Sequence, residues 1–498
     1  MADLREPPEP LNRSVEYSNG AGFGHSLAGQ SNASAGPQPQ PNTEGQTPIA
    51  PATKSPFALV QEGAGSEVLG VDDEGNTTHE IFMVGNNDQT LIALDGQTVR
   101  VLDSAKLDAP VGTFGEPAMK VKAAIALGSG TTVVVRYVDA KTNKPTNYLE
   151  CWNYKTQQSM WEIRVDGDVT HMTAVFDSNK NRGRFADAIV VASKIGMTRA
   201  GISVIAADGK FRNNPVSLEG RIIKLVSDVD AGGNAALAIT DEGTVAWVGS
   251  DGQIQGEPVS IEGLISTLCM NQDGSEAVAG TVDGQVWWID SAYGERPDQK
   301  PIQMKGGISH LKITPDGSQC LAGTMHGVVA WLTPDGIRGE SELQGMSTYV
   351  TALQMSLDGM NAVVGSNVGS LEWIGYDGIV AGEVAQLGSE ITHLKINTEG
   401  TLALVGTKEG GVAWVGFDGQ VKGKLSMLGG AITTMKISWA GNTGVAGLDT
   451  GEVVWFGEDG EPTADRANLF GKITQITLKA NGTGALAVTD EGTAAWVR

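Results

Sequence analysis

Cysteine is scarce in this chain, whose 498 residues include only Cys151, Cys269 and Cys320. Three scattered cysteines cannot form the framework of a disulfide-rich fold or a four-cysteine zinc site, so we expect buried, unreactive thiols. No apolar run approaches the roughly 18 residues that a membrane-spanning helix needs. Charged residues make up only 19% of the chain, whereas glycine accounts for 67 residues. This balance disfavours the helix-rich classes built from Ala, Glu, Lys and Leu.

Basic residues are also few, 35 against 58 acidic ones, which gives a formal net charge of -23. The longest basic stretch, residues 180–184, is too short to overcome repulsion from a nucleic acid. The first residues have neither the basic start nor the apolar core of a secretory signal. We therefore expect a cytoplasmic protein that binds neither nucleic acid nor membranes. Its net charge favours protein partners with a basic surface, because opposite charges steer association.

Residues 1–56 differ in composition from the rest of the chain. They hold nine of the 19 prolines, among Gly, Ser, Asn and Gln, with almost no clustering of apolar residues. Such a segment cannot bury enough apolar surface to offset the entropy lost on ordering. We predict a disordered tail, and the alternative role of a docking or tethering arm stays open.

A long-period repeat dominates the C-terminal part of the chain. Seven tryptophans recur at intervals of 41 to 43 residues, and each lies four residues after a glycine. Chance would not keep both spacings seven times, so we assign seven regular repeats to residues 218–498. The repeated tryptophans are Trp247, Trp288, Trp331, Trp373, Trp414, Trp455 and Trp496.

One repeat shows the internal pattern of them all. Its alternation of apolar runs and glycine turns predicts strands at Ile391–Ile396, Leu402–Thr407, Gly411–Val415 and Val421–Leu425. Four short antiparallel strands per repeat are typical of a β-propeller blade. Apolar residues lie on both faces of these strands, so each blade must pack between two neighbours. We therefore expect the seven tryptophans to form the core between blades.

Residues 57–217 repeat the same unit less regularly. Thr90–Gly96, Asn147–Trp152 and Gly201–Ile205 resemble the third strand, with longer intervals that imply insertions. They add about three irregular blades, so we predict an all-β propeller of about ten repeats. A single ten-bladed ring is favoured, because three blades cannot close a ring alone. The alternative is a seven-bladed ring, 218–498, beside a separate β unit.

The chain ends at Arg498, directly after a third strand, so the last blade lacks its fourth strand. An unpaired strand edge would be left on a ring that must close. We predict that a strand near Phe57–Gln61 completes this blade and joins the first repeat to the last.

The first strands carry apolar residues at positions 0, +3 and +5. Ile308, Leu311 and Ile313, for example, precede a Thr-Pro-Asp-Gly turn. This pattern resembles that of WD40 repeats over about 218–498, so we describe the chain as a divergent WD40-like propeller. It lacks the Gly-His dipeptide and the Trp-Asp pair of that family, and only Asp290 stands where the family aspartate would. The resemblance implies a non-enzymatic scaffold that binds proteins through its loops.

No catalytic motif is present. His171, His310 and His393 occupy the same position of three first strands, where other repeats have Thr, Ala or Gln. We interpret them as residues of the blades, and the recurring Asp-Gly pairs as hairpin turns. The sequence contains no nucleophile elbow, phosphate-binding loop or His-Glu-x-x-His motif. We expect no enzymatic activity and no cofactor.

One segment is a candidate metal site. It carries oxygen ligands at alternate positions, Asp177, Asn179 and Asn181, followed by Asp187. Such a spacing can wrap a hard cation, and it resembles the calcium loops of integrin-type propeller blades. We consider calcium as a possible ligand, against the alternative of a plain polar turn.

Two other functions stay open. The chain could be a small-ligand-binding or hydrolase- or lyase-type propeller that uses its central channel, because the first strands carry Thr, Ser, Lys, Gln and His. It could also be a structural or surface propeller with a calcium loop. The composition and repeats predict an architecture but do not identify the partner.

Overall fold

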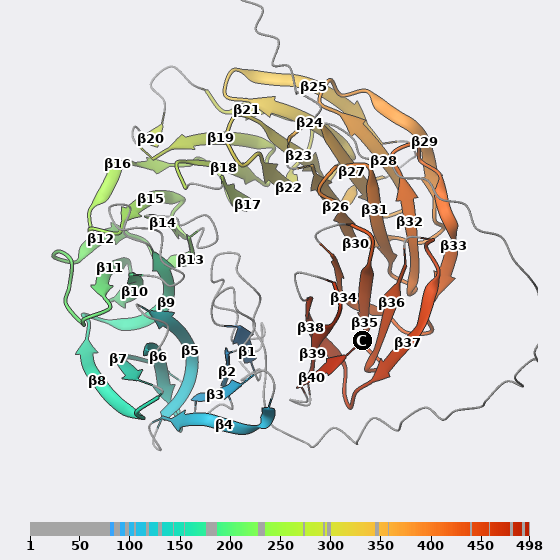
Figure 1. Cartoon of the computed structure of the whole chain (residues 1–498). Coiled ribbons are helices and arrows are strands. Elements are labelled where there is room, and N and C mark those ends of the chain that lie inside the picture. Colours follow the sequence, from blue (N-terminus) through green and yellow to red (C-terminus); the bar gives the residue numbers. More distant parts are fainter. Residues whose placement is uncertain are drawn as a thin grey trace, which may run out of the picture. The chain divides into compact units, whose positions relative to one another are not determined.

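The computed structural model describes residues 80–497 except for internal gaps, the longest of which are 84–89, 176–186 and 228–234. Every regular element in that part of the chain is a β-strand, and the strands form ten antiparallel sheets (Figure 1). The described residues contain no helix that is long and apolar enough to cross a membrane. We number the sheets 1 to 10 in chain order.

Sheets 1 to 3 precede the regular repeats, and each has four strands. Sheet 1 contains β1 (Glu80–Met83), β2 (Thr90–Leu94), β3 (Val99–Asp103) and β4 (Lys106–Phe114). Sheet 2 contains β5 (Met119–Leu127), β6 (Thr132–Asp139), β7 (Pro145–Asn153) and β8 (Gln158–Arg164). Sheet 3 contains β9 (Asp168–Val175), β10 (Ala188–Ile195), β11 (Arg199–Ala206) and β12 (Val216–Glu219).

Sheets 4 to 7 come next, and two strands share the fourth position of sheet 5. Sheet 4 contains β13 (Ile222–Ser227), β14 (Ala235–Thr240), β15 (Thr244–Gly249) and β16 (Ile254–Ser260). Sheet 5 contains β17 (Ile265–Met270), β18 (Glu276–Thr281), β19 (Gln285–Asp290), β20 (Gly294–Glu295) and β21 (Ile302–Gln303). Sheet 6 contains β22 (Ile308–Ile313), β23 (Cys320–Thr324), β24 (Val328–Thr333) and β25 (Gly336–Glu342). Sheet 7 contains β26 (Val350–Met355), β27 (Asn361–Ser366), β28 (Ser370–Gly375) and β29 (Val380–Gln386).

Sheets 8 to 10 complete the series, and sheet 10 has three strands in the described residues. Sheet 8 contains β30 (Ile391–Ile396), β31 (Leu402–Thr407), β32 (Gly411–Gly416) and β33 (Val421–Met427). Sheet 9 contains β34 (Ile432–Ile437), β35 (Gly444–Leu448), β36 (Glu452–Phe456) and β37 (Pro462–Asn468). Sheet 10 contains β38 (Ile473–Leu478), β39 (Ala485–Thr489) and β40 (Ala494–Val497).

The predicted fold class is confirmed: the chain is an all-β protein built from β-propeller blades, each a meander of antiparallel strands. One element of the prediction is wrong, because Thr90–Gly96 contains β2, the second strand of sheet 1, rather than a third strand. Its short apolar run followed by Asp-Gly looks the same in either position. The predicted tail, 1–56, and the closing strand, Phe57–Gln61, lie outside the described residues. The boundaries between 1–56, 57–217 and 218–498 stay predictions.

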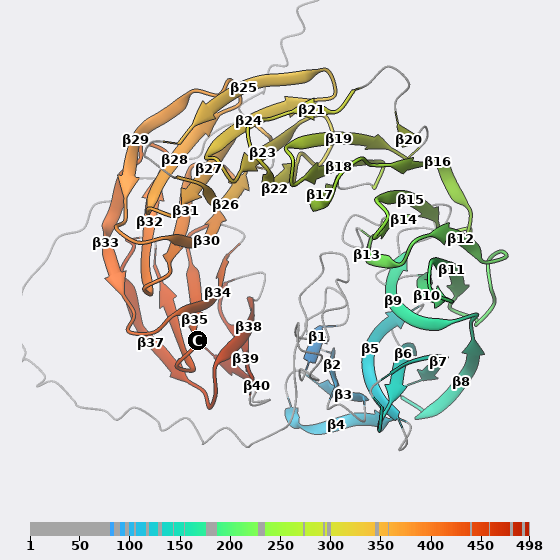
Figure 2. The same ribbon diagram turned by 180° about the vertical axis from the view of Figure 1, so that it is seen from behind.

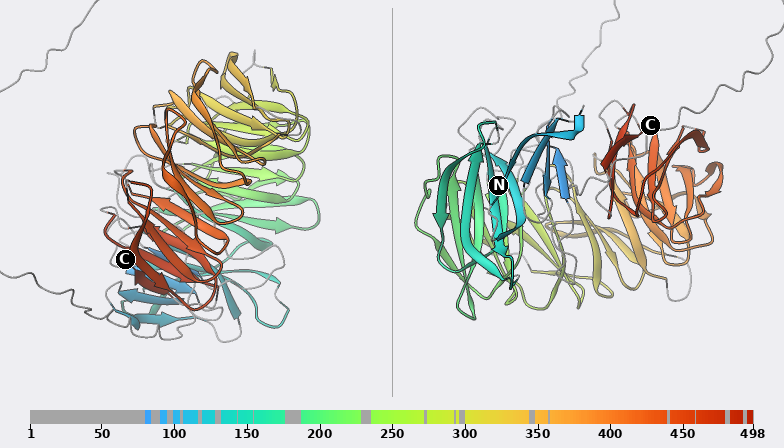
Figure 3. Two further views of the ribbon diagram at one scale, coloured as in Figure 1. Left: turned by 90° about the vertical axis from the view of Figure 1, so that its right-hand side faces the viewer. Right: turned by 90° about the horizontal axis from the view of Figure 1, so that it is seen from below.

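From sheet 5 to sheet 10, consecutive sheets contact one another through their first strands. Figures 1 and 2 show β22, β26, β30 and β34 on one side of the sheets and β25, β29, β33 and β37 on the other. Strand β22 contacts β17 and β26, and β30 contacts β26 and β34. Two further views show the sheets of this region facing one another (Figure 3). Each first strand is therefore an edge strand of its own sheet that packs beside the next one.

The repeated tryptophans pack between sheets. Six of the seven are at most 4% exposed, and Trp496 is half-buried. Trp373 of β28, for example, shares a core cluster with Ala403, Val405 and Ala413 of the next sheet. The small residues on the receiving face leave room for the large indole. The same six indoles have no hydrogen-bond partner for Nε1 within the described residues, so they contribute through packing alone.

In sheets 4 to 8 the turn between second and third strands uses the same chemistry, because a hydroxyl oxygen at the end of the second strand accepts the backbone N–H four residues later. In sheet 6 the Oγ1 of Thr324 accepts a hydrogen bond of 3.0 Å from the backbone N–H of Val328. Gly327 has a φ of 75°, and a Cβ on it would lie 2.7 Å from the backbone oxygen of Thr348. The glycine four residues before each of the first six repeated tryptophans is thus required by its positive φ and by the close approach of the loop before the first strand of the next sheet.

Candidate protein-interaction surface

The candidate calcium ligands are only partly described. Asp177, Asn179 and Asn181 lie outside the described residues, whereas Asp187 is half-buried and its backbone N–H donates to the carbonyl of Val175 over 3.1 Å. Within the part of the chain that the structure describes, no three His, Cys, Asp or Glu side chains are grouped as metal ligands would be. The calcium site stays a prediction.

The three histidines have one local role in three sheets. Each lies on a first strand, and its Nδ1 is hydrogen-bonded to the hydroxyl oxygen of the preceding Thr or Ser. The distance is 3.1 Å for His171, 3.0 Å for His310 and 2.9 Å for His393. The hydroxyl beside each ring also contacts a carbonyl of the second strand, where the register shifts. Burial lowers the pKa of all three rings, that of His171 to about 4. These are neutral structural side chains.

The aspartates of the Asp-Gly turns act within their own hairpins. Asp251, Asp377, Asp418 and Asp459 each accept a hydrogen bond from the backbone N–H two residues later, over 3.0 to 3.1 Å. A side chain that accepts from its own turn stabilises that turn. The repeat of carboxylates along the chain therefore reflects a repeat of hairpins.

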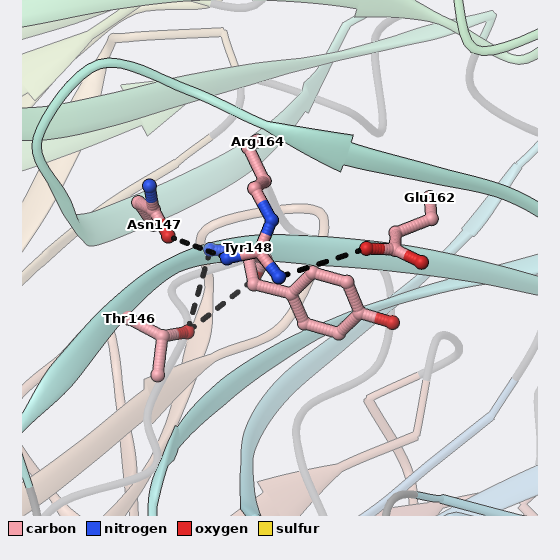
Figure 4. Close-up of polar contacts among 5 residues, drawn as sticks. All are labelled: Thr146, Asn147, Tyr148, Glu162 and Arg164. Atoms are coloured by element: carbon pink, nitrogen blue, oxygen red, sulfur yellow. Dashed lines mark hydrogen bonds and ion pairs between the residues drawn. The ribbon is translucent and has the colours of Figure 1, made fainter.

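An exposed polar group on sheet 2 surrounds Arg164 (Figure 4). Its guanidinium donates to the Oδ1 of Asn147 over 3.4 Å, lies 3.8 Å from the carboxylate of Glu162, and stands 5.4 Å from the centre of the Tyr148 ring. Both charged side chains are more than half exposed. Solvent screens such a pair, so it contributes little to stability. The group has the character of an ordinary surface ion pair.

A different feature emerges at the edge where second strands turn into third strands. Because strands alternate in direction, the residue before the first strand also lies at this edge. In sheets 4 to 10 the residue after the second strand donates its backbone N–H to the carbonyl of the residue before the first strand, over 2.8 to 3.2 Å. We call these two positions the turn pair. The pairs are Arg221 and Asp241, Leu264 and Val282, Gly307 and Met325, Tyr349 and Asn367, Glu390 and Lys408, Ala431 and Asp449, and Lys472 and Asp490.

The chemistry of the turn pair divides the sheets into two groups. Sheets 4 and 8 have ion pairs of 2.7 Å, Arg221 with Asp241 and Lys408 with Glu390. In sheets 9 and 10 an aspartate Oδ1 accepts the backbone N–H of its partner position, over 2.8 and 2.7 Å. Sheets 5 to 7 present apolar side chains at or beside these positions, and in sheet 7 the Oδ1 of Asn367 also accepts the backbone N–H of Tyr349 over 2.9 Å. The change from charged to apolar is confined to three consecutive sheets.

These apolar side chains are exposed. The exposed fraction runs from 41% for Tyr349 to 66% for Leu264. The first strands of the three sheets, β17, β22 and β26, contact one another in order, so the side chains occupy neighbouring sheets. We call this set the apolar turn patch. It consists of Leu264, Val282, Met325, Tyr349 and Val368.

Carboxylates flank the patch. Glu262 and Asp283 are exposed beside Leu264 and Val282 in sheet 5. Exposed Glu242 and Glu409 lie in the equivalent turns of the sheets on either side, 4 and 8. The nearby basic groups Arg221 and Lys408 are already paired with carboxylates. The surroundings of the patch are therefore acidic, in keeping with the net charge of the chain.

The patch was not predicted from the sequence. Its members are not spaced regularly, and none of them is one of the glycines or tryptophans that define the repeat. A comparison of the two residues before each of these glycines would have found part of it. In sheets 5 to 7 one residue of each such pair is apolar, Val282, Met325 or Val368, whereas the other four turns carry only Asp, Glu, Lys or Thr.

Comparison with known proteins identifies no family: no family model matches the chain, and no curated protein sequence matches it. Solved structures include similar chains. The computationally designed Ika8 protein is 19% identical, with a TM-score of 0.42, over 67% of this chain and 96% of its own. Sqt1 of Chaetomium thermophilum, solved with the N-terminus of the ribosomal protein L10, is 12% identical with a TM-score of 0.45. That match covers 63% of this chain and 94% of Sqt1.

Proposed function

We propose that this chain is a divergent WD40-like β-propeller that serves as a non-enzymatic protein-interaction scaffold in the cytoplasm. The apolar turn patch carries the proposal. The same positions are ion-paired in sheets 4 and 8, with the backbone hydrogen bond unchanged. The fold therefore does not require apolar side chains there. Adjacent exposed apolar groups on a protein surface mark an interaction site.

The expected partner is a protein segment that offers apolar side chains with basic residues beside them. Burying each apolar side chain of the patch contributes about 1 to 2 kcal/mol, so two or three anchors account for a specific contact. Exposed Glu242, Glu262, Asp283 and Glu409 around the patch attract lysine or arginine and repel an acidic protein. A basic partner is thus favoured by steering, and its apolar residues determine how long it stays bound.

The proposal is tested by purifying the tagged full-length chain from its source cells after cross-linking. Wild type is compared with the double variant Met325→Asp, Val368→Asp, in which the patch becomes acidic. We expect a partner with basic and apolar residues at the cross-link, recovered at least tenfold less with the double variant. Direct titration of that partner's cross-linked segment against both proteins then measures the loss of affinity.

Ile379→Asp provides the matched control. Ile379 is 65% exposed and belongs to the hairpin between third and fourth strands of sheet 7, at the opposite edge of the same sheet. This variant has the same change in chemistry and should keep the partner. Equal recovery with all three proteins, at equal melting temperature, would refute the proposed surface. Loss with Ile379→Asp as well would show that the effect is general and not local.

A further inference from the structure

Three lysines occupy one position of the first strands. Lys312, Lys395 and Lys436 are each the fifth of six residues in β22, β30 and β34. Their cross-strand partners are Leu321, Leu404 and Val445, which lie in turn opposite the repeated tryptophans. The register of the sheets, rather than the chain order, brings these amines to one level. We call them the lysine row.

The amines are near enough to affect one another. Strands β22, β26, β30 and β34 pack side by side in that order, and Gln354 holds the equivalent position in β26. Burial, with smaller contributions from the charges of Lys436 and Lys312, lowers the pKa of Lys395 to about 8. Lys312 is exposed and Lys395 is half-buried. The row therefore concentrates positive charge on the first-strand side of a chain that is otherwise acidic.

No carboxylate of the described residues neutralises Lys312 or Lys395. Neither ammonium has an ion-pair or hydrogen-bond partner there. The aspartates in the turns after β22 and β26 act within those turns: Asp316 accepts from Thr314 and Ser318, and Asp358 accepts from Ser356 and the backbone of Met360. Like charges held together without a counter-charge disfavour the charged state. An anion bound between them would remove that penalty.

We propose that the lysine row is a binding site for a small ligand that carries two or more phosphate groups. Lysine is a compact point charge that suits phosphate oxygens, and the amide of Gln354 adds a donor between two of the lysines. The row extends over four sheets, so a single phosphate could not reach all of it. The net charge of -23 disfavours a long polyanion, whose remaining charges would face acidic surface.

This site is separate from the apolar turn patch. The first strand begins at the edge that carries the patch, and the fifth residue of six lies towards the opposite edge. The proposal therefore concerns a second ligand and does not depend on the protein partner. Either site could fail its test while the other passes.

Calorimetric titration of the full chain with sodium triphosphate at neutral pH and low salt tests the site. We expect binding by the wild type, and at least a tenfold loss of affinity in Lys395→Met, Lys436→Met. Lys424→Met is the matched control, because Lys424 lies on β33 of sheet 8, the sheet that holds Lys395, and its ammonium is paired with the carboxylate of Glu461 at 3.0 Å. Its affinity should stay within twofold of the wild type.

Amine labelling of the wild-type chain gives a second readout that does not depend on whether a variant folds. Triphosphate should slow acetylation of Lys312 and Lys395, measured by mass spectrometry, but not that of Lys424. The absence of binding at millimolar triphosphate, or equal affinity in the double variant, would overturn the proposal. Tighter binding of a hexaglutamate peptide than of triphosphate would overturn the assignment to phosphate.

Discussion

Trp373 allows the contribution of the repeated indoles to be measured. Its side chain is fully buried, and it packs on Ala403, Val405 and Ala413 of the next sheet. It also meets the ring of Phe417 edge-on, with ring centres 5.5 Å apart. Trp373→Ala removes this contact and leaves a cavity between sheets 7 and 8. We expect it to lower the free energy of unfolding by about 3 to 5 kcal/mol.

Trp373→Phe separates packing from hydrogen bonding. The indole Nε1 is buried without a partner, and an unpaired buried N–H costs about 1 to 3 kcal/mol. A phenyl ring keeps much of the apolar contact and removes that cost. The two effects oppose each other, so we expect the net change in the free energy of unfolding to stay within about 1 kcal/mol.

Guanidinium unfolding followed by far-ultraviolet circular dichroism measures both variants, because other tryptophans would complicate fluorescence. The expected result is a large loss for alanine and a small change for phenylalanine. If both variants lost several kcal/mol, the indole N–H would have a stabilising partner. If the alanine variant lost less than about 1 kcal/mol, Trp373 would not be packed between sheets, and the account of blade packing would be wrong.

Three further predictions concern other buried features. Burial keeps His171 neutral in the folded state, with a pKa of about 4. The free energy of unfolding should therefore be highest above pH 6.5 and fall by up to about 3 kcal/mol as the pH drops towards 4. Urea unfolding at several pH values should show this dependence on pH, and His171→Gln should reduce it. Burial raises the pKa of Cys151 to about 12 and also raises that of Cys320, so Ellman's reagent should titrate no more than one thiol in the native protein and three in guanidinium; rapid reaction of all three would contradict their burial. Gly327 and Gly388 share a φ of 75°, but only Gly327 faces a close backbone atom. Gly327→Ala should therefore lower the free energy of unfolding by at least about 1 kcal/mol more than Gly388→Ala. Equal melting temperatures of the two variants would refute the steric argument.

The regular sheets could be predicted from the sequence because each strand carries its own local signal. The strands expected at Ile391–Ile396 and Leu402–Thr407 coincide with β30 and β31, and β33 runs two residues beyond the predicted Leu425. Glycine turns and alternating apolar runs depend only on neighbouring residues. Sheet 1 lacks the repeated tryptophan, so the position of β2 within its sheet could not be read from its composition.

The candidate sites could not be predicted in the same way, because their members meet only through the sheets. Leu264 and Val282 are 18 residues apart in the chain and become one turn pair through a backbone hydrogen bond of 3.0 Å. Lys312 and Lys395 are separated by two repeats and reach one level through strand register. Neither relation can be read from neighbouring residues alone. From the sequence, the first-strand lysines are only polar residues of a possible channel.

The repeat explains how one fold can hold two such different surfaces. The turn pair keeps its backbone hydrogen bond whether its side chains are Arg and Asp, as in sheet 4, or Leu and Val, as in sheet 5. The fifth position of the first strand likewise accepts Cys269, Gln354 or a lysine without a change of register. The turn pair lies at a sheet edge, and the fifth position takes either an apolar side chain that packs on the core, as Cys269 does against the Trp288 cluster, or a lysine. Side chains at both positions can therefore change while the strand pairing is kept, which is why substitutions there can test binding.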